Sequence, residues 1–124
     1  MSDETAVVQG AYEAFARGDV PAVVAAVDAN VDWDVPDVLP HGGSFHGPEG
    51  VGQFFQGLGS AWSELGLEID DLVASDGMVV GVGRASGSLS EGGEAGYGFA
   101  HVFTVRDGKI VRFREFVDPD AALS

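Results

Sequence analysis

Cysteine is absent from the sequence, and this absence removes two kinds of stabilising site. Without thiols the fold has no disulfide bond and no metal ion held by cysteine. The chain also lacks a run of about 18 apolar residues, the length that a helix needs to cross a bilayer. Its start, Met1 to Glu4, has neither the basic segment nor the apolar stretch of a secretory signal. We therefore expect a cytoplasmic protein with no membrane partner.

Basic residues are also scarce. Six Lys and Arg oppose 20 Asp and Glu, for a formal net charge of -14, and Lys109 is the sole lysine. Nucleic acids and anionic membranes bind clustered Lys and Arg, so neither is an expected partner. The acids are scattered along the chain and not gathered in a tail. This pattern indicates a solvated acidic surface of the kind found in halophilic, acidic proteomes.

Apolar residues are plentiful, at 45% of the 124 positions, and continue from one end to the other. This predicts one domain over residues 1–124 with a single core. Helical spacing predicts a first helix over Asp3 to Arg17, closed by Gly18, and a second that Asp19 caps and that extends to Val27. A third helix begins at Pro48 and carries an aromatic face. The apolar residues of that face are Val51, Phe54, Phe55, Leu58 and Trp62.

Beyond the second helix the apolar period changes from helical to alternating. Val31, Trp33 and Val35 alternate with acids, which predicts a short strand. The stretch 36–47 is rich in Pro and Gly and is predicted to be a loop across the mouth of a pocket. Four more strands are predicted near 65–75, 77–90, 94–105 and 109–117, paired as antiparallel hairpins. The order indicates an α+β fold, with helices on a curved, mostly antiparallel sheet and an apolar pocket between the layers.

The last hairpin decides which side chains share the pocket face with His101, and two registers compete. A two-residue Asp107-Gly108 loop places Arg112 and Arg114 beside His101. A three-residue loop from Arg106 to Gly108 pairs Val105 with Lys109 and places His101 opposite Phe113. We prefer the second register, because it gathers aromatic residues and Glu115 on the pocket face and avoids burying two arginines. That face then holds Tyr97, Phe99, His101, Phe103, Val111, Phe113, Glu115 and Val117.

An imidazole and a carboxylate, His101 and Glu115, are thus expected on neighbouring strands, diagonal to each other inside the pocket. Burial raises the pKa of a carboxyl group and lowers that of an imidazole, while pairing acts in the opposite sense on both. Such a pair suits general acid and base chemistry. The alternative is a core histidine held by a buried glutamate for structure alone.

A second set of polar residues lies on or near the loop. His41 and His46, with Asp37, include the donor types of a metal site. We do not assign a metal to them, and the expected site contains neither a metal nor a cofactor.

Local motifs complete this order of elements. The motifs are Tyr12-Glu13-Ala14-Phe15-Ala16-Arg17-Gly18-Asp19, Val31-Asp32-Trp33, Phe45-His46-Gly47-Pro48-Glu49-Gly50-Val51 with Phe54-Phe55, and Asp107-Gly108-Lys109-Ile110-Val111 with Glu115-Phe116. With these motifs the chain resembles the SnoaL-like members of the nuclear transport factor 2 superfamily. The resemblance implies a cone-shaped domain that admits a small, largely apolar molecule. It also implies a homodimer through the outer face of the sheet, where Arg112 and Arg114 would lie.

The resemblance also distinguishes between reactions. In ketosteroid isomerases of this superfamily the catalytic base falls on Val35, and His101 replaces a protonated Asp. Polyketide cyclases of the SnoaL type place a histidine and an acid on neighbouring strands, at the positions of His101 and Glu115. The chain is therefore expected to differ from a classical ketosteroid isomerase and to be closer to the cyclases.

From these features we expect a cofactor-free enzyme of the isomerase, cyclase or dehydratase type that acts on a small hydrophobic carbonyl compound. Glu115 and His101 are its expected acid and base, and Tyr12 orients an oxygen. The alternative is a ligand-binding or dimerisation module of the same fold without catalysis. The residues expected to shape the ligand pocket are Trp33, Val35, Phe54, Trp62, Phe99, Phe103 and Phe113.

Overall fold

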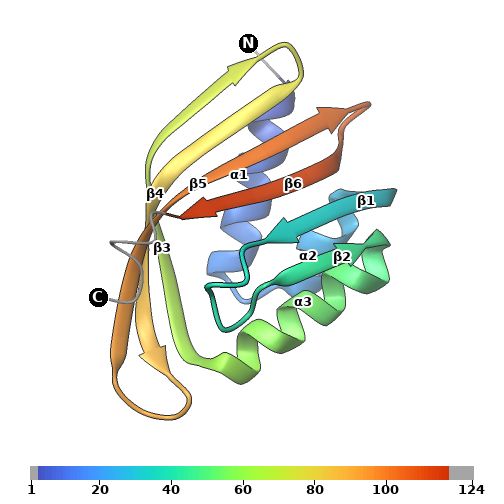
Figure 1. Ribbon diagram of the computed structural model, residues 1–124. Coiled ribbons are helices and arrows are strands. Elements are labelled where there is room, and N and C mark those ends of the chain that lie inside the picture. Colours follow the sequence, from blue (N-terminus) through green and yellow to red (C-terminus); the bar gives the residue numbers. More distant parts are fainter. Residues whose placement is uncertain (1–2, 118–124) are drawn as a thin grey trace.

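Three helices lie against one face of a curved six-stranded sheet in the computed structural model, which describes residues 3–117 (Figure 1). The sheet is mostly antiparallel and does not close into a barrel, as the α+β prediction requires. The helices are α1 (Asp3–Ala16), α2 (Val20–Ala25) and α3 (Gly47–Ala61). The strands are β1 (Val27–Val35), β2 (Gly43–His46), β3 (Trp62–Ser75), β4 (Met78–Leu89), β5 (Glu94–Arg106) and β6 (Lys109–Val117).

The first two helices meet where the sequence predicts. Gly18 adopts a left-handed backbone with φ of 73°, and its N–H donates to the Phe15 carbonyl at 2.9 Å, which ends the α1 segment. Asp19 then caps α2, because its side chain accepts from the Ala22 N–H at 3.2 Å. The predicted end of α2 is wrong: Val27 belongs to β1, where it pairs with Ile110 of β6.

The strand order is β2-β1-β6-β5-β4-β3, and β1 runs parallel to β6 while every other pair is antiparallel. The helices cover the face on which every second residue of β4, β5 and β6 is buried. Part of the predicted loop 36–47 is a strand, β2, in which Phe45 pairs with Trp33. Trp62 also differs from the prediction, since it begins β3 and does not lie within α3. Fully buried aliphatic side chains fill the interface between the layers: Val8, Val31, Val51, Val79 and Ile110.

The last hairpin combines features of both registers. Arg106 pairs with Lys109, so the loop has two residues, Asp107 and Gly108, both with positive φ, and the predicted three-residue loop is wrong. A β-bulge then follows, because Val105 pairs with Ile110 while the preceding Thr104 pairs with Arg112.

The bulge changes the side of the strand that later residues occupy. Val111 is the additional residue, and beyond it Phe113 and Glu115 face the helices, while Arg112 and Arg114 are exposed. The face assignment is therefore confirmed for Phe113 and Glu115 but is wrong before the bulge, where Ile110 and not Val111 is fully buried opposite Val105. His101 pairs with Glu115 and not with Phe113, so the two ionisable residues are directly opposite and not diagonal.

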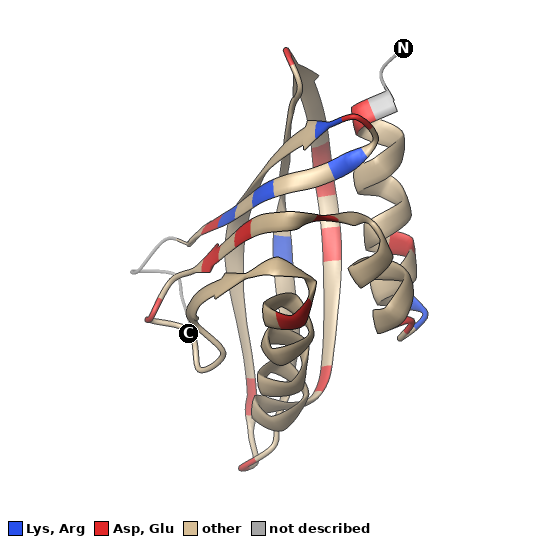
Figure 2. Ribbon diagram, turned by 90° about the vertical axis from the view of Figure 1, so that its right-hand side faces the viewer, with Lys and Arg blue, Asp and Glu red and all other residues tan. Residues whose placement is uncertain are grey.

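Charges cover the outer surface, and acids appear on helices, strands and turns (Figure 2). The parallel register of β1 and β6 places Asp32 beside Arg112 and Asp34 beside Arg114, so opposite charges are neighbours there. Phe116 is 46% exposed on the same outer face, with the Arg114 guanidinium 5.1 Å from its ring centre. Dimerisation through this face stays a prediction. No helix within residues 3–117 is long and apolar enough to span a membrane.

Candidate functional site

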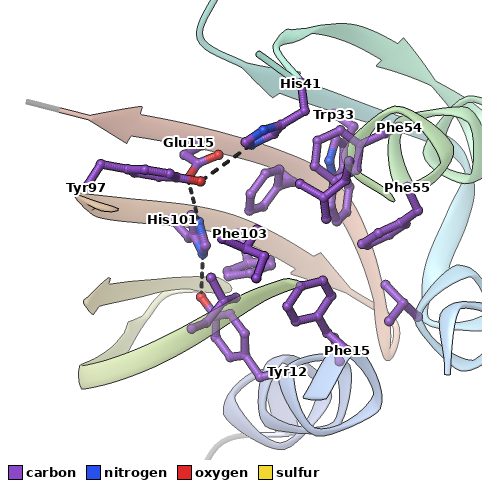
Figure 3. Close-up of a pocket in the computed structure, with 16 residues that line it drawn as sticks. Tyr12, Phe15, Trp33, His41, Phe54, Phe55, Tyr97, His101, Phe103 and Glu115 are labelled. Carbon is purple, nitrogen blue, oxygen red and sulfur yellow. Dashed lines mark hydrogen bonds and ion pairs between the residues drawn. The ribbon is translucent and has the colours of Figure 1, made fainter. Parts of the chain in front are cut away.

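A mostly aromatic cavity lies between the helices and the sheet (Figure 3). Its volume is about 70 Å³. A water molecule needs about 10–15 Å³ of such space, so the cavity has room for about five waters or one small ring. The lining residues are Ala11, Tyr12, Phe15, Val23, Trp33, His41, Phe54, Phe55, Leu58, Leu65, Leu67, Tyr97, His101, Phe103, Phe113 and Glu115. Among the lining residues within 3–117, Glu115 is the only acid and none is Lys or Arg.

The first polar group in this cavity is a chain of three side chains from α1, β5 and β6. The hydroxyl of Tyr12 lies 2.8 Å from His101 Nδ1, and His101 Nε2 lies 3.1 Å from Glu115 Oε2. The His101 and Glu115 side chains are only 7% and 5% exposed. Figure 3 shows the three joined in line along one wall. The sequence thus places a buried, hydrogen-bonded acid and base pair where it was expected.

The protonation state of Tyr12 follows from its surroundings. Burial raises the pKa of the Tyr12 hydroxyl well above its usual value, and the negative charge of Glu115 raises it further. The hydroxyl therefore keeps its proton near neutral pH, and it is the hydrogen-bond partner of His101 Nδ1, while Glu115 is the partner of His101 Nε2. Tyr12 was expected to orient a ligand oxygen, but in the structure its partner is His101. Glu115 Oε1 takes no part in these hydrogen bonds.

Aromatic rings fix the orientation of the imidazole. Phe99 stacks on His101 with ring centres 3.9 Å apart and planes 12° apart. Phe113 approaches edge-on, with its centre at 5.0 Å. These contacts hold both ring nitrogens in the line between Tyr12 and Glu115.

A second polar group contains His41, which lies on the loop between β1 and β2 and is buried. The indole N–H of Trp62 donates to His41 Nδ1 at 3.1 Å, and His41 Nε2 lies 3.5 Å from the Tyr97 hydroxyl. Burial lowers the pKa of His41, partly offset by the charge of Glu115. Burial and the Glu115 charge both raise the pKa of Tyr97. Both residues are therefore neutral near pH 7.

A third polar group is the indole N–H of Trp33. Trp33 is 4% exposed and lines the cavity, and its Nε1 has no hydrogen-bond partner among residues 3–117. Buried donors are nearly always paired, so a free one in a cavity wall points to a site for an acceptor.

The predicted site residues divide into two sets. The cavity is lined by Tyr12, Trp33, Phe54, His101, Phe103, Phe113 and Glu115. Val35, Trp62 and Phe99 are buried but are not among the lining residues. Phe99 instead supports His101, and Trp62 supports His41. These two residues therefore contact the polar groups from behind the cavity wall.

The sequence prediction of the site did not include His41, and it named Tyr97 only as a residue of the pocket face. The mouth loop brings His41 into the interior through two tight turns, in which the Leu39 N–H donates to the Pro36 carbonyl and the Gly42 N–H to the Leu39 carbonyl. Gly42 is the feature of the sequence that could have indicated this loop conformation, because a Cβ at this position would clash with the Pro36 carbonyl oxygen.

No metal site forms from the loop histidines. His46 lies on the surface, where its Nδ1 is 3.0 Å from Asp32 Oδ1, and the two side chains are 66% and 62% exposed. His41 is buried elsewhere, against Trp62 and Tyr97. Within residues 3–117 no group of three or more His, Asp or Glu residues is arranged to hold a metal ion.

Known proteins share this architecture along the whole chain. An NTF2-like protein of unknown function from Burkholderia pseudomallei is 31% identical, with a TM-score of 0.89 over 97% of this chain and 94% of its own. An NTF2-like protein from Burkholderia thailandensis is 29% identical, with a TM-score of 0.89 over 98% and 95%. A candidate polyketide cyclase from Xanthomonas campestris pv. campestris is 26% identical, with a TM-score of 0.82 over 98% and 97%. No curated protein matches.

The family assignment rests on a sequence match as well as on the fold. The model of the SnoaL-like domain matches residues 8–113, a range that includes most of α1, strands β1 to β5, the first part of β6 and His101, and that ends before Glu115. The chain therefore belongs to the SnoaL-like domain family.

Proposed function

We propose that this protein is a cofactor-free enzyme that moves a proton within a small, mostly apolar carbonyl compound, in an isomerisation, cyclisation or dehydration. The observation that carries the proposal is the buried His101 and Glu115 pair, 3.1 Å apart, in the wall of an otherwise aromatic cavity. A pair kept for structure alone needs no cavity beside it. The similarity to a candidate polyketide cyclase supports the same class of reaction.

The roles follow from the hydrogen bonds. Glu115 Oε1, which His101 leaves free, takes a proton from the carbon next to the carbonyl group. The electron pair of that C–H bond moves onto the carbonyl oxygen and forms an enolate. The protonated carboxyl group then returns the proton at another atom of the same molecule, so no oxidant or reductant is needed. His101 orients the carboxylate, and Tyr12 holds the His101 ring in place through its contact with Nδ1.

Deuterium exchange tests this step without knowledge of the natural substrate. Cyclohexanone, cyclohexenone and acetophenone are incubated with the protein in D2O, and deuterium at the carbon next to the carbonyl is followed by NMR. We expect exchange above the buffer rate, and a loss of about 100-fold or more in Glu115→Gln and in His101→Ala.

The surface pair His46 and Asp32 provides a matched control, since it has the same two chemical groups in contact with solvent. His46→Ala and Asp32→Asn should leave exchange unchanged. Exchange no faster than in buffer for every compound, or equal exchange by parent and Glu115→Gln, contradicts the proposal.

A ligand-binding module without catalysis is the second candidate, and the small cavity volume of about 70 Å³ favours it. Val35 also lacks the carboxyl group that the isomerase resemblance would need there. Binding of the same compounds without deuterium exchange is the outcome that supports this candidate.

A further inference from the structure

The Trp62, His41 and Tyr97 side chains form a second hydrogen-bonded chain whose direction can be assigned. An indole N–H only donates, so His41 Nδ1 is an acceptor. A neutral imidazole with an unprotonated Nδ1 carries its proton on Nε2. That proton faces the Tyr97 hydroxyl oxygen, 3.5 Å from Nε2. Tyr97 is therefore the acceptor in this contact.

The hydroxyl proton of Tyr97 has no acceptor in the described part of the chain. Its one hydrogen-bond partner there is His41, and that contact uses the oxygen as acceptor. Tyr97 is 2% exposed and lines the cavity, so its hydroxyl group is shielded from bulk water. A buried donor without an acceptor is costly, and a ligand oxygen removes that cost.

We infer that Tyr97 is the oxygen-binding donor of the cavity, that Trp62 and His41 are positioning residues that hold its direction, and that the ligand is a neutral carbonyl compound. The class of ligand follows from the charges of the cavity wall. Glu115 lines the same cavity and no Lys or Arg of the described residues 3–117 does, so a carboxylate or phosphate ligand would be repelled without compensation. The free N–H of Trp33 adds a second neutral donor to the wall. The inference deepens the proposed function by naming what it binds, but it does not require turnover.

Two molecules that differ only at the oxygen test the assignment. Cyclohexanone and methylenecyclohexane have the same ring, and the second carries CH2 in place of the carbonyl oxygen. Their dissociation constants are measured for the parent and for Tyr97→Phe, which keeps the ring and removes the hydroxyl. We expect Tyr97→Phe to weaken cyclohexanone binding about tenfold and methylenecyclohexane binding not at all.

The surface residue His46 is the control, because its side chain is 66% exposed and it is not one of the lining residues of the cavity. His46→Ala should leave the binding of both molecules unchanged. The assignment is overturned if the parent binds neither molecule, or if Tyr97→Phe changes the dissociation constants of both molecules by the same factor. Oxygen-specific binding without deuterium exchange instead leaves it standing and rejects the proposed enzyme.

The positioning role has its own spectroscopic readout. In the parent, 15N NMR of His41 should show an unprotonated Nδ1 and a protonated Nε2. Trp62→Phe removes the N–H that fixes this tautomer, so His41 should become a mixture of tautomers. The same variant should weaken cyclohexanone binding, but by less than Tyr97→Phe does. A His41 protonated on Nδ1 in the parent overturns the direction assigned to the chain.

Discussion

Gly81 leaves room for the hydroxyl group of Tyr12, since a Cβ atom at Gly81 would lie 2.6 Å from Tyr12 Oη. Gly81 pairs with His101 across β4 and β5, so the hydroxyl reaches Nδ1 by passing over a strand position without a side chain. Gly81→Ala should therefore displace Tyr12 from His101 and destabilise the fold by about 1–3 kcal/mol. Urea unfolding measures the loss of stability, and deuterium exchange measures the effect of the lost hydrogen bond.

Gly10→Ala is the control for that substitution, because Gly10 lies in the same helix as Tyr12 and a Cβ there meets no atom within 4 Å. It should stabilise the protein by up to about 1 kcal/mol through helix propensity. Equal stability of the Gly81→Ala variant and the parent would show that Tyr12 does not need this space.

The two pairs of histidine with an acid should differ in energy because they differ in burial. Removing His101 leaves the buried Glu115 carboxylate without its partner, which we expect to cost about 3–5 kcal/mol of unfolding free energy. Removing His46 from Asp32 should cost about 1 kcal/mol or less, because both side chains are exposed. Urea titration of the two alanine variants at neutral pH makes the comparison. Similar losses in both would mean that water reaches Glu115 freely.

Alkaline pH should unfold the protein through its tyrosines. The sequence has two tyrosines, Tyr12 and Tyr97, and burial raises the pKa of both above the ordinary 10.0. Above pH 10 the unfolded chain releases phenol protons that the folded chain retains, so stability falls as pH rises. Phenolate absorbance should appear together with the loss of circular dichroism. Phenolate formation near pH 10 with the fold intact would contradict this prediction.

Mildly acidic pH should also destabilise the protein, in this case through His41. Burial lowers its pKa from the ordinary 6.5, so below pH 6.5 the unfolded chain binds a proton that the folded chain does not. Stability should then decrease as pH falls through this range. His41→Gln, which keeps an acceptor for the Trp62 N–H, should remove that part of the decrease. The measurement is urea unfolding at several pH values, and parallel pH profiles for parent and variant would show that His41 is not responsible.

Salt should stabilise the fold, given a formal net charge of -14 spread over the surface in Figure 2. At about 1 M salt the screening length is about 3 Å, which suppresses repulsion between exposed carboxylates. The midpoint of thermal unfolding should rise markedly in molar KCl. A midpoint that does not change with KCl would argue against a halophilic surface.

Much of the fold could be predicted from hydrophobic periodicity and turn residues in the sequence. Asp19 and Gly18 mark the junction of the first helices, and the glycine turns mark the hairpins of the sheet, because these signals act within a few residues. The pair of His101 and Glu115 was also predicted, since alternation along β5 and β6 decides which residues face inward.

The missed features depend on contacts between distant segments. The burial of His41 requires Trp62 and Tyr97, which lie 21 and 56 residues away in sequence. Strand β2 is four residues long and exists by pairing with β1, so its own composition gives little signal. The bulge at Val111 was missed because a local count of turn residues assumes regular pairing on both sides of the turn.

That one additional residue has a consequence for the electrostatics of the whole pocket. With the same two-residue turn and regular pairing, the strand position opposite His101 would be occupied by Arg114, and the imidazole would meet a guanidinium instead of a carboxylate. The sign of the charge beside the imidazole is thus decided by the number of backbone residues between the turn and the site. Without the bulge at Val111, Arg112 and Arg114 would take the places of Phe113 and Glu115 opposite Phe103 and His101, and an acidic wall would become a cationic one.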